Sequence, residues 1–233
     1  HRASKTKLLP ALDKLLKDVE VAPHQLACVI CGKGPGSFTG VRIALSTAKG
    51  IAISLSIPLI SVSTLDAVAW SASNAGFTGN LLVVADAMRH EVYTAIFELG
   101  DDWVARITHD TVMKLERFLS SSVTLSEASA PSEVEKSLQN ARHYITGDAL
   151  RKYSKELEGQ GELLPIELWE CTAHDLFCTF QAQWQARETN PQDFVKHHPS
   201  FALPVYTRLS YAEENERKRL SKVGAKLPLR KLE

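Results

Sequence analysis

The chain has 233 residues, of which 27 are Lys or Arg and 27 are Asp or Glu, so its formal net charge is zero. This balance excludes a global positive field that would hold nucleic acid by itself. The length allows a sizeable core without disulfides or metals, and Arg42 and Lys49 interrupt the most apolar segment, which argues against a membrane span. Because no N-terminal signal pattern is seen, we expect a soluble, cytoplasmic protein.

The first predicted element is an amphipathic helix near the N-terminus. Leu8, Leu12, Leu15 and Val19 recur at helical spacing, and charged residues fill most of the gaps between them. The apolar residues 26–31 then predict a short buried strand.

The cysteines raise the question of a metal or redox site. Cys28 and Cys31 have the spacing of zinc ribbons and thioredoxin sites, but on a strand they point to opposite faces, and Cys171 and Cys178 do not repeat the spacing. No histidine lies four residues from another, so a His-x3-His site is absent. Buried structural thiols are therefore favoured over metal ligands.

Residues 33–42 join this strand to a long apolar helix and form the most informative segment. Gly34 and Gly36 permit unusual backbone conformations, and Ser37 or Thr39 can cap the first free N–H groups of the helix. Such a junction presents backbone donors to an anion, although a tight strand-to-helix turn is the simpler interpretation.

Standard nucleotide and nucleophile motifs do not match this loop. A phosphate loop needs Lys directly after its last glycine, whereas Val41 follows Gly40. A nucleophile elbow needs glycines two residues on either side of Ser37, where Pro35 and Thr39 stand. A dinucleotide fingerprint needs an acidic residue at the end of the next strand, and none is present.

The helix predicted over residues 38–55 has two contrasting faces. An apolar stripe should face the sheet; it consists of Val41, Ala44, Leu45, Ala48, Ile51, Ala52 and Leu55. The opposite face carries few charges and consists of Arg42, Ile43, Ser46, Thr47, Lys49, Gly50, Ile53 and Ser54. Small residues and isolated isoleucines favour a helix-to-helix interface over water, the alternative being burial under the C-terminal segment or the first helix.

The remaining elements alternate along the chain. Strands are predicted at 58–62, 81–85 and 91–99, and helices at 64–73, with Ser63 as the cap, and at 173–187. We expect a parallel sheet with right-handed crossovers, to which residues 91–99 add an antiparallel edge strand. Residues 120–132 read as a surface loop, 144–148 as a strand and turn, and 211–222 as a charged, exposed tail.

Two further residues have alternative interpretations. Asp86 ends an apolar strand, where its carboxylate could ligate Mg²⁺ or act as a base, but formation of the following turn is favoured. Arg208 could pair with phosphate, although a structural cap or salt bridge is more usual for one Arg beside an aromatic residue.

Three separated blocks resemble the TsaB (YeaZ) family over nearly the whole chain. They are Gly34–Arg42 (Gly-Pro-Gly-Ser-Phe-Thr-Gly-Val-Arg), Asp86–Tyr93 (Asp-Ala-Met-Arg-His-Glu-Val-Tyr) and Pro204–Arg208 (Pro-Val-Tyr-Thr-Arg). The resemblance implies an α/β fold of the actin-like ATPase (ASKHA) type, with mixed sheets flanked by helices. It also implies two lobes. Residues 1–110 would form the N-terminal lobe, with the Gly-rich loop and the interface helices, and residues 111–233 the smaller C-terminal lobe with the charged tail.

The chain also departs from the family pattern. It begins at His1, about where the first helix of the family starts, so the initial strands are expected to be missing or cleaved. Met88 stands where the family often has Arg, and His90 where it often has Gly, with Arg89 as a substitute for the missing Arg.

The resemblance implies a catalytically silent scaffold in the complex that makes threonylcarbamoyladenosine at position 37 of tRNA. Its partners would be a TsaD-like catalytic subunit and a TsaE-like ATPase, with tRNA bound only through the complex, a homodimer in isolation, and no membrane contact. No cofactor would be bound by this chain alone, although ATP or ADP could sit at the complex interface. The expected partner interface comprises Leu8, Leu12, Ile43, Ser46, Thr47, Gly50 and Ile53. A separate hairpin motif comprises Asp86, Glu91 and Tyr93. The alternative is a hydrolase, peptidase-like or a small ATPase, acting alone.

Overall fold

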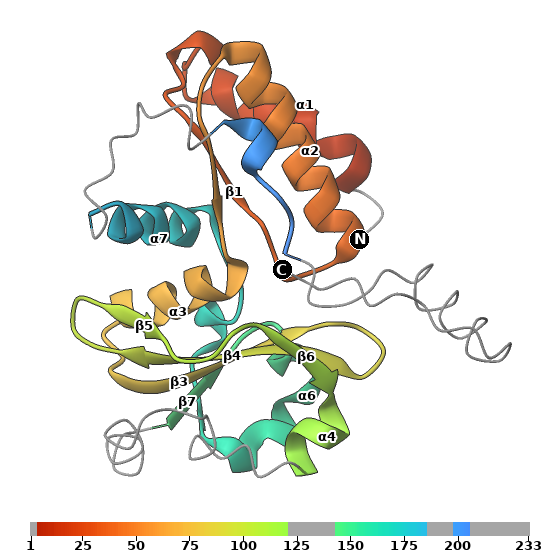
Figure 1. Ribbon diagram of the computed structural model, residues 1–233, viewed down its shortest axis with the longest axis vertical. Helices are drawn as coiled ribbons and strands as arrows, with labels where there is room; N and C mark the ends of the chain where they lie inside the picture. Colours follow the sequence, from red (N-terminus) through yellow and green to blue (C-terminus); the bar gives the residue numbers. More distant parts are fainter. Residues whose placement is uncertain (1–3, 121–142, 186–197, 206–233) are drawn as a thin grey trace, which may run out of the picture.

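The computed structural model describes residues 4–120, 143–185 and 198–205, and they form two units stacked one above the other (Figure 1). The upper unit contains a small sheet and the long N-terminal helices, and the lower unit contains a larger sheet. All but Ser120 of the loop predicted at 120–132 lies outside the described residues, as do the predicted tail at 211–222 and residues 206–208 of the third block. The α/β class with mixed sheets flanked by helices is confirmed.

The upper sheet has two parallel strands, β1 (Val29–Gly32) and β2 (Leu59–Val62), with Val29 paired to Leu59. They are joined by α2 (Phe38–Leu55), whose apolar stripe packs on them through Leu45, Ala48 and Ala52. Helix α1 (Ser4–Asp18) and the short helix η1 (Pro23–Gln25) precede the sheet. The predicted strand-helix-strand crossover is thus present.

Local signals set the ends of α2. The Ser37 hydroxyl accepts a hydrogen bond from the Gly40 N–H at 3.3 Å and so caps the first turn. At the other end Ser56 adopts a left-handed conformation, with φ of 53°, which stops the helix. Both bounds agree with the sequence prediction.

The lower sheet is mixed and has the strand order β5-β4-β3-β7-β8, with β6 also paired to β4. The strands are β3 (Gly79–Asp86), β4 (Glu91–Leu99), β5 (Val104–Arg106), β6 (Thr111–Lys114), β7 (His143–Thr146) and β8 (Glu162–Leu163). Strands from both sides of the expected lobe boundary at residue 110 share this sheet; the boundary itself stays a prediction.

Two predictions about strand pairing were wrong. Strand β3 does not join β1 and β2, because a tight hairpin to β4 occupies one of its edges and parallel β7 occupies the other. Strand β4 is not an edge strand, because the chain beyond it turns back and adds β5 and β6 to its free side.

Helices cover both faces of the lower sheet. One face packs against α3 (Thr64–Asn74) through Leu65, Val68 and Ala69, with Phe97 at the centre. The other packs against α4 (Leu115–Ser120) and α6 (Leu150–Leu157), which the short helix η2 (Glu158–Gln160) follows. The short helix η3 (Ile166–Leu168) packs on the α3 side through Leu168.

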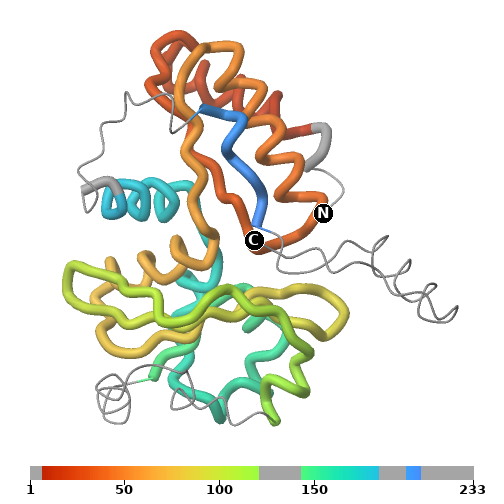
Figure 2. The backbone as a smooth tube through the Cα atoms, viewed as in Figure 1, coloured from red at the N-terminus to blue at the C-terminus, as the bar shows by residue number. Residues whose placement is uncertain are grey.

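Helix α7 (Ala173–Gln185) links the two units. It packs on α3 and also on β1 and β2, and the backbone trace shows it lying between the two units (Figure 2). The short helix η4 (Pro199–Phe201) then returns to α2, where Ala202 is buried in the upper core. Within the described ranges, none of the helices combines the length and apolar character needed to cross a membrane.

Candidate functional site

The Gly-rich loop acts as a joint between segments that are distant in sequence. The Thr64 N–H, at the start of α3, donates to the Gly34 carbonyl at 2.9 Å, and the Lys33 N–H donates to the Val62 carbonyl at 2.8 Å. The Val205 N–H donates to the Lys33 carbonyl at 2.9 Å. Gly34 has φ of +95°, a conformation that side chains disfavour. The loop therefore fixes β1, β2 and the C-terminal segment relative to α2.

The loop residues change from buried to exposed as the chain enters α2. Gly34 and Pro35 are buried and Gly36 is half-buried, whereas the next residues, Ser37, Phe38, Thr39, Gly40 and Arg42, are exposed. The Arg42 guanidinium lies 4.3 Å from the centre of the Phe38 ring, a cation–π contact at the surface. The start of α2 thus presents an aromatic and a cationic group to the outside.

The outer face of α2 is open, as the partner-interface prediction requires. Ser46 and Gly50 are exposed, and a Cβ built on Gly50 would meet no atom within 4 Å. Ile53 keeps 59% of its surface exposed. Ile43 was predicted to be exposed but is half-buried, as is Thr47. Of the described C-terminal residues, 198–205, Ala202 packs with the sheet-facing residues of α2 rather than with this outer face.

Helix α1 and Val19, the residue that follows it, expose apolar side chains. Leu9, Leu15 and Val19 are 59%, 55% and 55% exposed, whereas the predicted contact residues Leu8 and Leu12 are half-buried. None of the three buried core clusters includes a residue of α1. Helical periodicity located this apolar side correctly but gave no sign that the fold leaves much of it uncovered.

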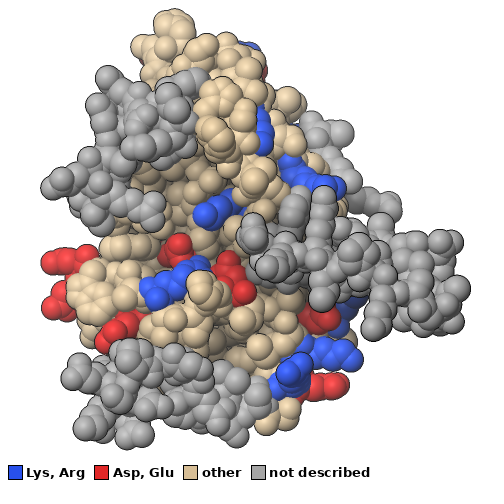
Figure 3. All heavy atoms as spheres, in the orientation of Figure 1, with Lys and Arg blue, Asp and Glu red and all other residues tan. Residues whose placement is uncertain are grey.

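Two charge pairs form along α1. Lys14 pairs with Asp18 at 2.5 Å and Lys17 with Asp13 at 2.7 Å, both four residues apart on the helix. Exposed pairs of this kind contribute only about 0.3–0.5 kcal/mol each. The helix also contains Lys5 and Lys7, so its lysines outnumber its aspartates. On the face drawn in Figure 3, acidic side chains gather over the lower unit, and the upper unit shows isolated Lys and Arg among uncharged groups.

Asp86 forms a turn and an ion pair, which agrees with the favoured interpretation of this residue. Its Oδ1 accepts from the Met88 N–H at 3.0 Å, and its Oδ2 pairs with the Lys152 ammonium, a hydrogen bond that raises the pKa of Lys152. The Asp86 N–H donates to Asp148 at 2.7 Å. The carboxylate is thus engaged in holding the β3–β4 hairpin to α6.

The hairpin tip has unusual backbone geometry. Met88, Arg89 and His90 have φ of 64°, 55° and 59°, three successive non-glycine residues in the left-handed region. The Glu91 N–H donates to the Met88 carbonyl at 2.9 Å, and the Leu115 N–H donates to the His90 carbonyl at 2.8 Å. Of the other motif residues, Glu91 is half-buried and Tyr93 is buried in β4. This strained tip lies in the lower unit, apart from the exposed face of α2.

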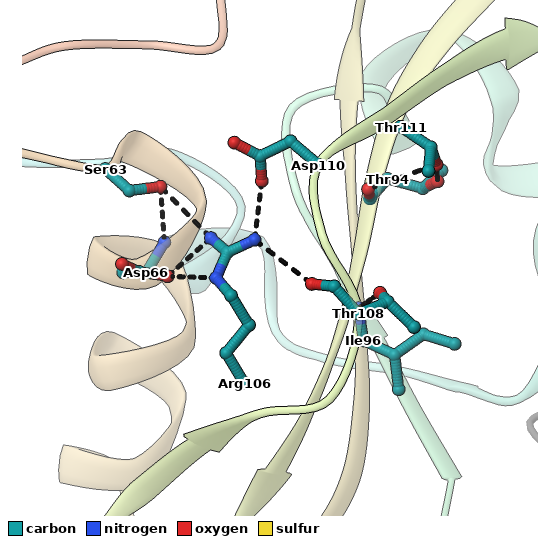
Figure 4. A network of polar contacts seen from close by, with 8 residues as sticks. All are labelled: Ser63, Asp66, Thr94, Ile96, Arg106, Thr108, Asp110 and Thr111. Carbon is teal, nitrogen blue, oxygen red and sulfur yellow. Dashed lines mark hydrogen bonds and ion pairs between the residues drawn. The ribbon is translucent and has the colours of Figure 1, made fainter. Parts of the chain in front are cut away.

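An arginine network that the sequence did not suggest connects the lower sheet to the segment after β2 (Figure 4). Arg106 donates to Asp66 through Nε at 2.9 Å and to Asp110 through Nη1 at 2.6 Å, and it also contacts Ser63 Oγ at 3.1 Å. Burial alone would lower the pKa of Arg106, but attraction to Asp66 and Asp110 reverses this effect and raises it. No motif signals the network, because Arg106 and Asp110 lie 40 or more residues after Ser63 and Asp66.

The four thiols are free, and their surroundings differ. Cys31 is buried, whereas Cys28, Cys171 and Cys178 are half-buried. The prediction of buried thiols therefore holds fully only for Cys31. Burial raises the pKa of Cys28, of Cys31 to about 11 and of Cys171 to about 12. Within the described residues, no group of three or more His, Cys, Asp or Glu side chains could hold a metal ion.

Comparison with known proteins gives consistent similarities. A family model described as "TsaD: tRNA N6-adenosine threonylcarbamoyltransferase" matches residues 1–202. The TsaB protein of Bacillus subtilis is 36% identical over 113 residues, which are 48% of this chain and 48% of that protein. The chain thus aligns with about half the length of this relative. The Haemophilus influenzae TsaB protein is 28% identical over 72% of this chain and 70% of its own length.

Solved structures agree on the fold. YeaZ from Pseudomonas aeruginosa superposes with a TM-score of 0.63 at 23% identity, covering 88% of this chain and 84% of that one. A second structure from the same organism, titled as similar to peptidase YEAZ, gives a TM-score of 0.63 at 24% identity, covering 87% and 83%. With the family match, these likenesses confirm the predicted α/β fold of the actin-like ATPase type.

Proposed function

The chain belongs to the TsaB (YeaZ) family, and we propose that it is a non-catalytic scaffold subunit in the formation of threonylcarbamoyladenosine at position 37 of tRNA. In this proposal it binds and supports a TsaD-like catalytic subunit in the cytoplasm, with a TsaE-like ATPase as a further partner. tRNA is bound through the assembled complex, in keeping with the zero net charge of the chain. ATP or ADP, if present, belongs to the interface of the complex.

The observation that carries the proposal is the open outer face of α2. Gly50 has empty space above it, and Ser46 is small, so a partner helix can approach the α2 backbone closely. Ile53 would lose its exposed apolar surface in that contact, which favours association by the hydrophobic effect. A face that stayed in water would normally carry more Glu and Lys.

The exposed apolar residues of α1 extend the same argument. We define the α1–α2 surface as Leu9, Leu15, Val19, Ser46, Gly50 and Ile53. Leaving Leu9, Leu15 and Val19 in water is costly, and covering them offsets that cost. Lys14 and Lys17 are paired within α1, so a partner need not supply charges to meet these two lysines.

The structural contacts of Asp86 and Ser37 support a non-catalytic role. Asp86 is engaged in a turn and an ion pair, and Ser37 caps α2. Both are thereby committed to structure, which is unlike the accessible, activated groups that hydrolysis requires. The competing hydrolase hypothesis therefore has less support than the scaffold.

Reconstitution tests the proposal. The purified chain should neither hydrolyse ATP nor transfer a threonylcarbamoyl group to tRNA, whereas adding it to a TsaD-like subunit should raise that subunit's transfer activity. Activity of the chain alone would favour the hydrolase hypothesis. Lack of any effect on the TsaD-like subunit would contradict the scaffold role.

A further inference from the structure

Helix α7 has an inward face that fixes its orientation. The Asp175 carboxylate accepts from the Thr172 N–H and hydroxyl, both at 2.7 Å, and Asp175 and Thr179 are buried. His174, the residue before Asp175, is exposed, and Cys178, half-buried, follows one turn later. Side chains four residues apart on a helix lie one above the other, so these two groups converge.

The distance between the two donor atoms suits a tetrahedral metal ion. Cys178 Sγ lies 3.4 Å from His174 Nε2. With bonds of about 2.3 Å from zinc to sulfur and about 2.0 Å to nitrogen, this separation corresponds to an angle of about 104° at the metal, near the tetrahedral value of about 109°. The pair therefore needs no movement of the backbone to hold zinc.

The chemistry of the pair selects the same kind of ion. Thiolate and imidazole together favour zinc and other borderline-soft cations over magnesium or calcium, which prefer oxygen. The remaining cysteines are poorer ligands, because burial raises the pKa of Cys28, Cys31 and Cys171 and keeps their thiols protonated.

We propose that His174 and Cys178 form an exchangeable binding site for a borderline-soft divalent cation, of which Zn²⁺ is the best match. On binding, the S–H bond of Cys178 breaks, its proton passes to the solvent, and the sulfur and His174 Nε2 each donate an electron pair to the metal. The other two tetrahedral positions hold water. Two protein donors give an exchangeable site, unlike the three or four ligands of catalytic and structural zinc sites.

Protection of the thiol from alkylation tests the site on the full chain. Cys178 is alkylated with iodoacetamide, with and without Zn²⁺ added as its chloride, and modification of its peptide is followed by mass spectrometry. Saturating zinc should slow the reaction of Cys178 at least tenfold. His174→Ala should abolish this protection, and His24→Ala, which removes another exposed histidine far along the chain, should keep it.

Cobalt provides a second readout. Co²⁺ should give a sulfur-to-metal charge-transfer band in the near ultraviolet with the unmodified chain and lose it with Cys178→Ser. Because His174 is exposed and neither side chain belongs to a buried core cluster, circular dichroism of the variants should match that of the parent. Equal alkylation rates with and without zinc, or protection that survives His174→Ala, would overturn the site and leave only a thiol–imidazole hydrogen bond.

Discussion

His90 occupies a backbone conformation that glycine would adopt at lower cost. Its φ of 59° follows two residues that are also left-handed, and each non-glycine residue in this region costs about 1–2 kcal/mol. The hydrogen bond from the Leu115 N–H to its carbonyl helps to hold this geometry. The sequence resemblance already marked this position as one where glycine is usual, and the strain gives the physical reason.

We therefore expect His90→Gly to stabilise the protein. Relief of strain should exceed the greater entropy of glycine in the unfolded chain, leaving a net gain of about 0.5–1 kcal/mol. The loss of the ring contact to Tyr153, whose centroid is 6.2 Å away, is minor. His109→Gly is the control, since His109 is exposed without a positive φ and should be destabilised; urea unfolding that ranks the two variants the other way would refute the argument.

Arg106 should be far more costly to remove than an exposed arginine. Arg106→Met leaves Asp66 and Asp110 without their cation at side-chain exposures of only 20% and 12%. Because the network is partly solvated, we discount the value for buried pairs to about 2 kcal/mol.

Arg151→Met is the matched control, because its pair with Glu170 is more than half exposed on both sides. It should cost less than about 0.5 kcal/mol. Equal losses of unfolding free energy in the two variants would show that the Arg106 network contributes no more than a surface ion pair.

Among the elements, those specified by local signals were predictable. The bounds of α2 follow from a capping serine and an uninterrupted apolar stripe, both visible in the sequence. The partners of β3 were not predictable in this way, because pairing depends on β7, about 60 residues later. The Arg106 network was missed for the same reason, since it joins residues up to 43 positions apart.

The candidate surface was only partly predictable at this scale. The small residues of α2 identified its open face, but periodicity alone predicted only that α1 is amphipathic. In the fold, Leu9 and Leu15 stay exposed because no buried core cluster reaches α1. A sequence pattern shows that a helix has an apolar side, and only the tertiary structure shows what covers it.

Substitutions should separate the exposed leucines of α1 from the core leucines of α2. Leu15→Ala should change the unfolding free energy by less than about 0.5 kcal/mol, as is usual for surface positions. Leu45→Ala should cost about 2–5 kcal/mol, because Leu45 is buried between α2 and the β1–β2 sheet. Chemical denaturation of both variants measures the contrast, and a large loss for Leu15→Ala would mean that α1 is packed by this chain itself.

At the scale of the whole molecule, two joints connect the upper and lower units. The Gly-rich loop receives hydrogen bonds from the start of α3 and from Val205, and α7 packs on both α3 and the upper strands. The part of α2 that we propose to face a partner begins directly after that loop. The loop therefore positions the proposed binding surface relative to the lower sheet, a role that requires no chemistry of its own.

The most direct test of the scaffold proposal is the association of the chain with a TsaD-like subunit, measured by isothermal titration calorimetry for Gly50→Arg and for Gly159→Arg. Both glycines have open space where a side chain would go, but Gly159 lies in the lower unit, away from the α1–α2 surface. Gly50→Arg should leave folding intact and weaken association by several kcal/mol, because it separates the helices and buries an unpaired charge, whereas Gly159→Arg should bind as the parent does. Unchanged affinity for Gly50→Arg would contradict the proposal that α2 is the contact surface.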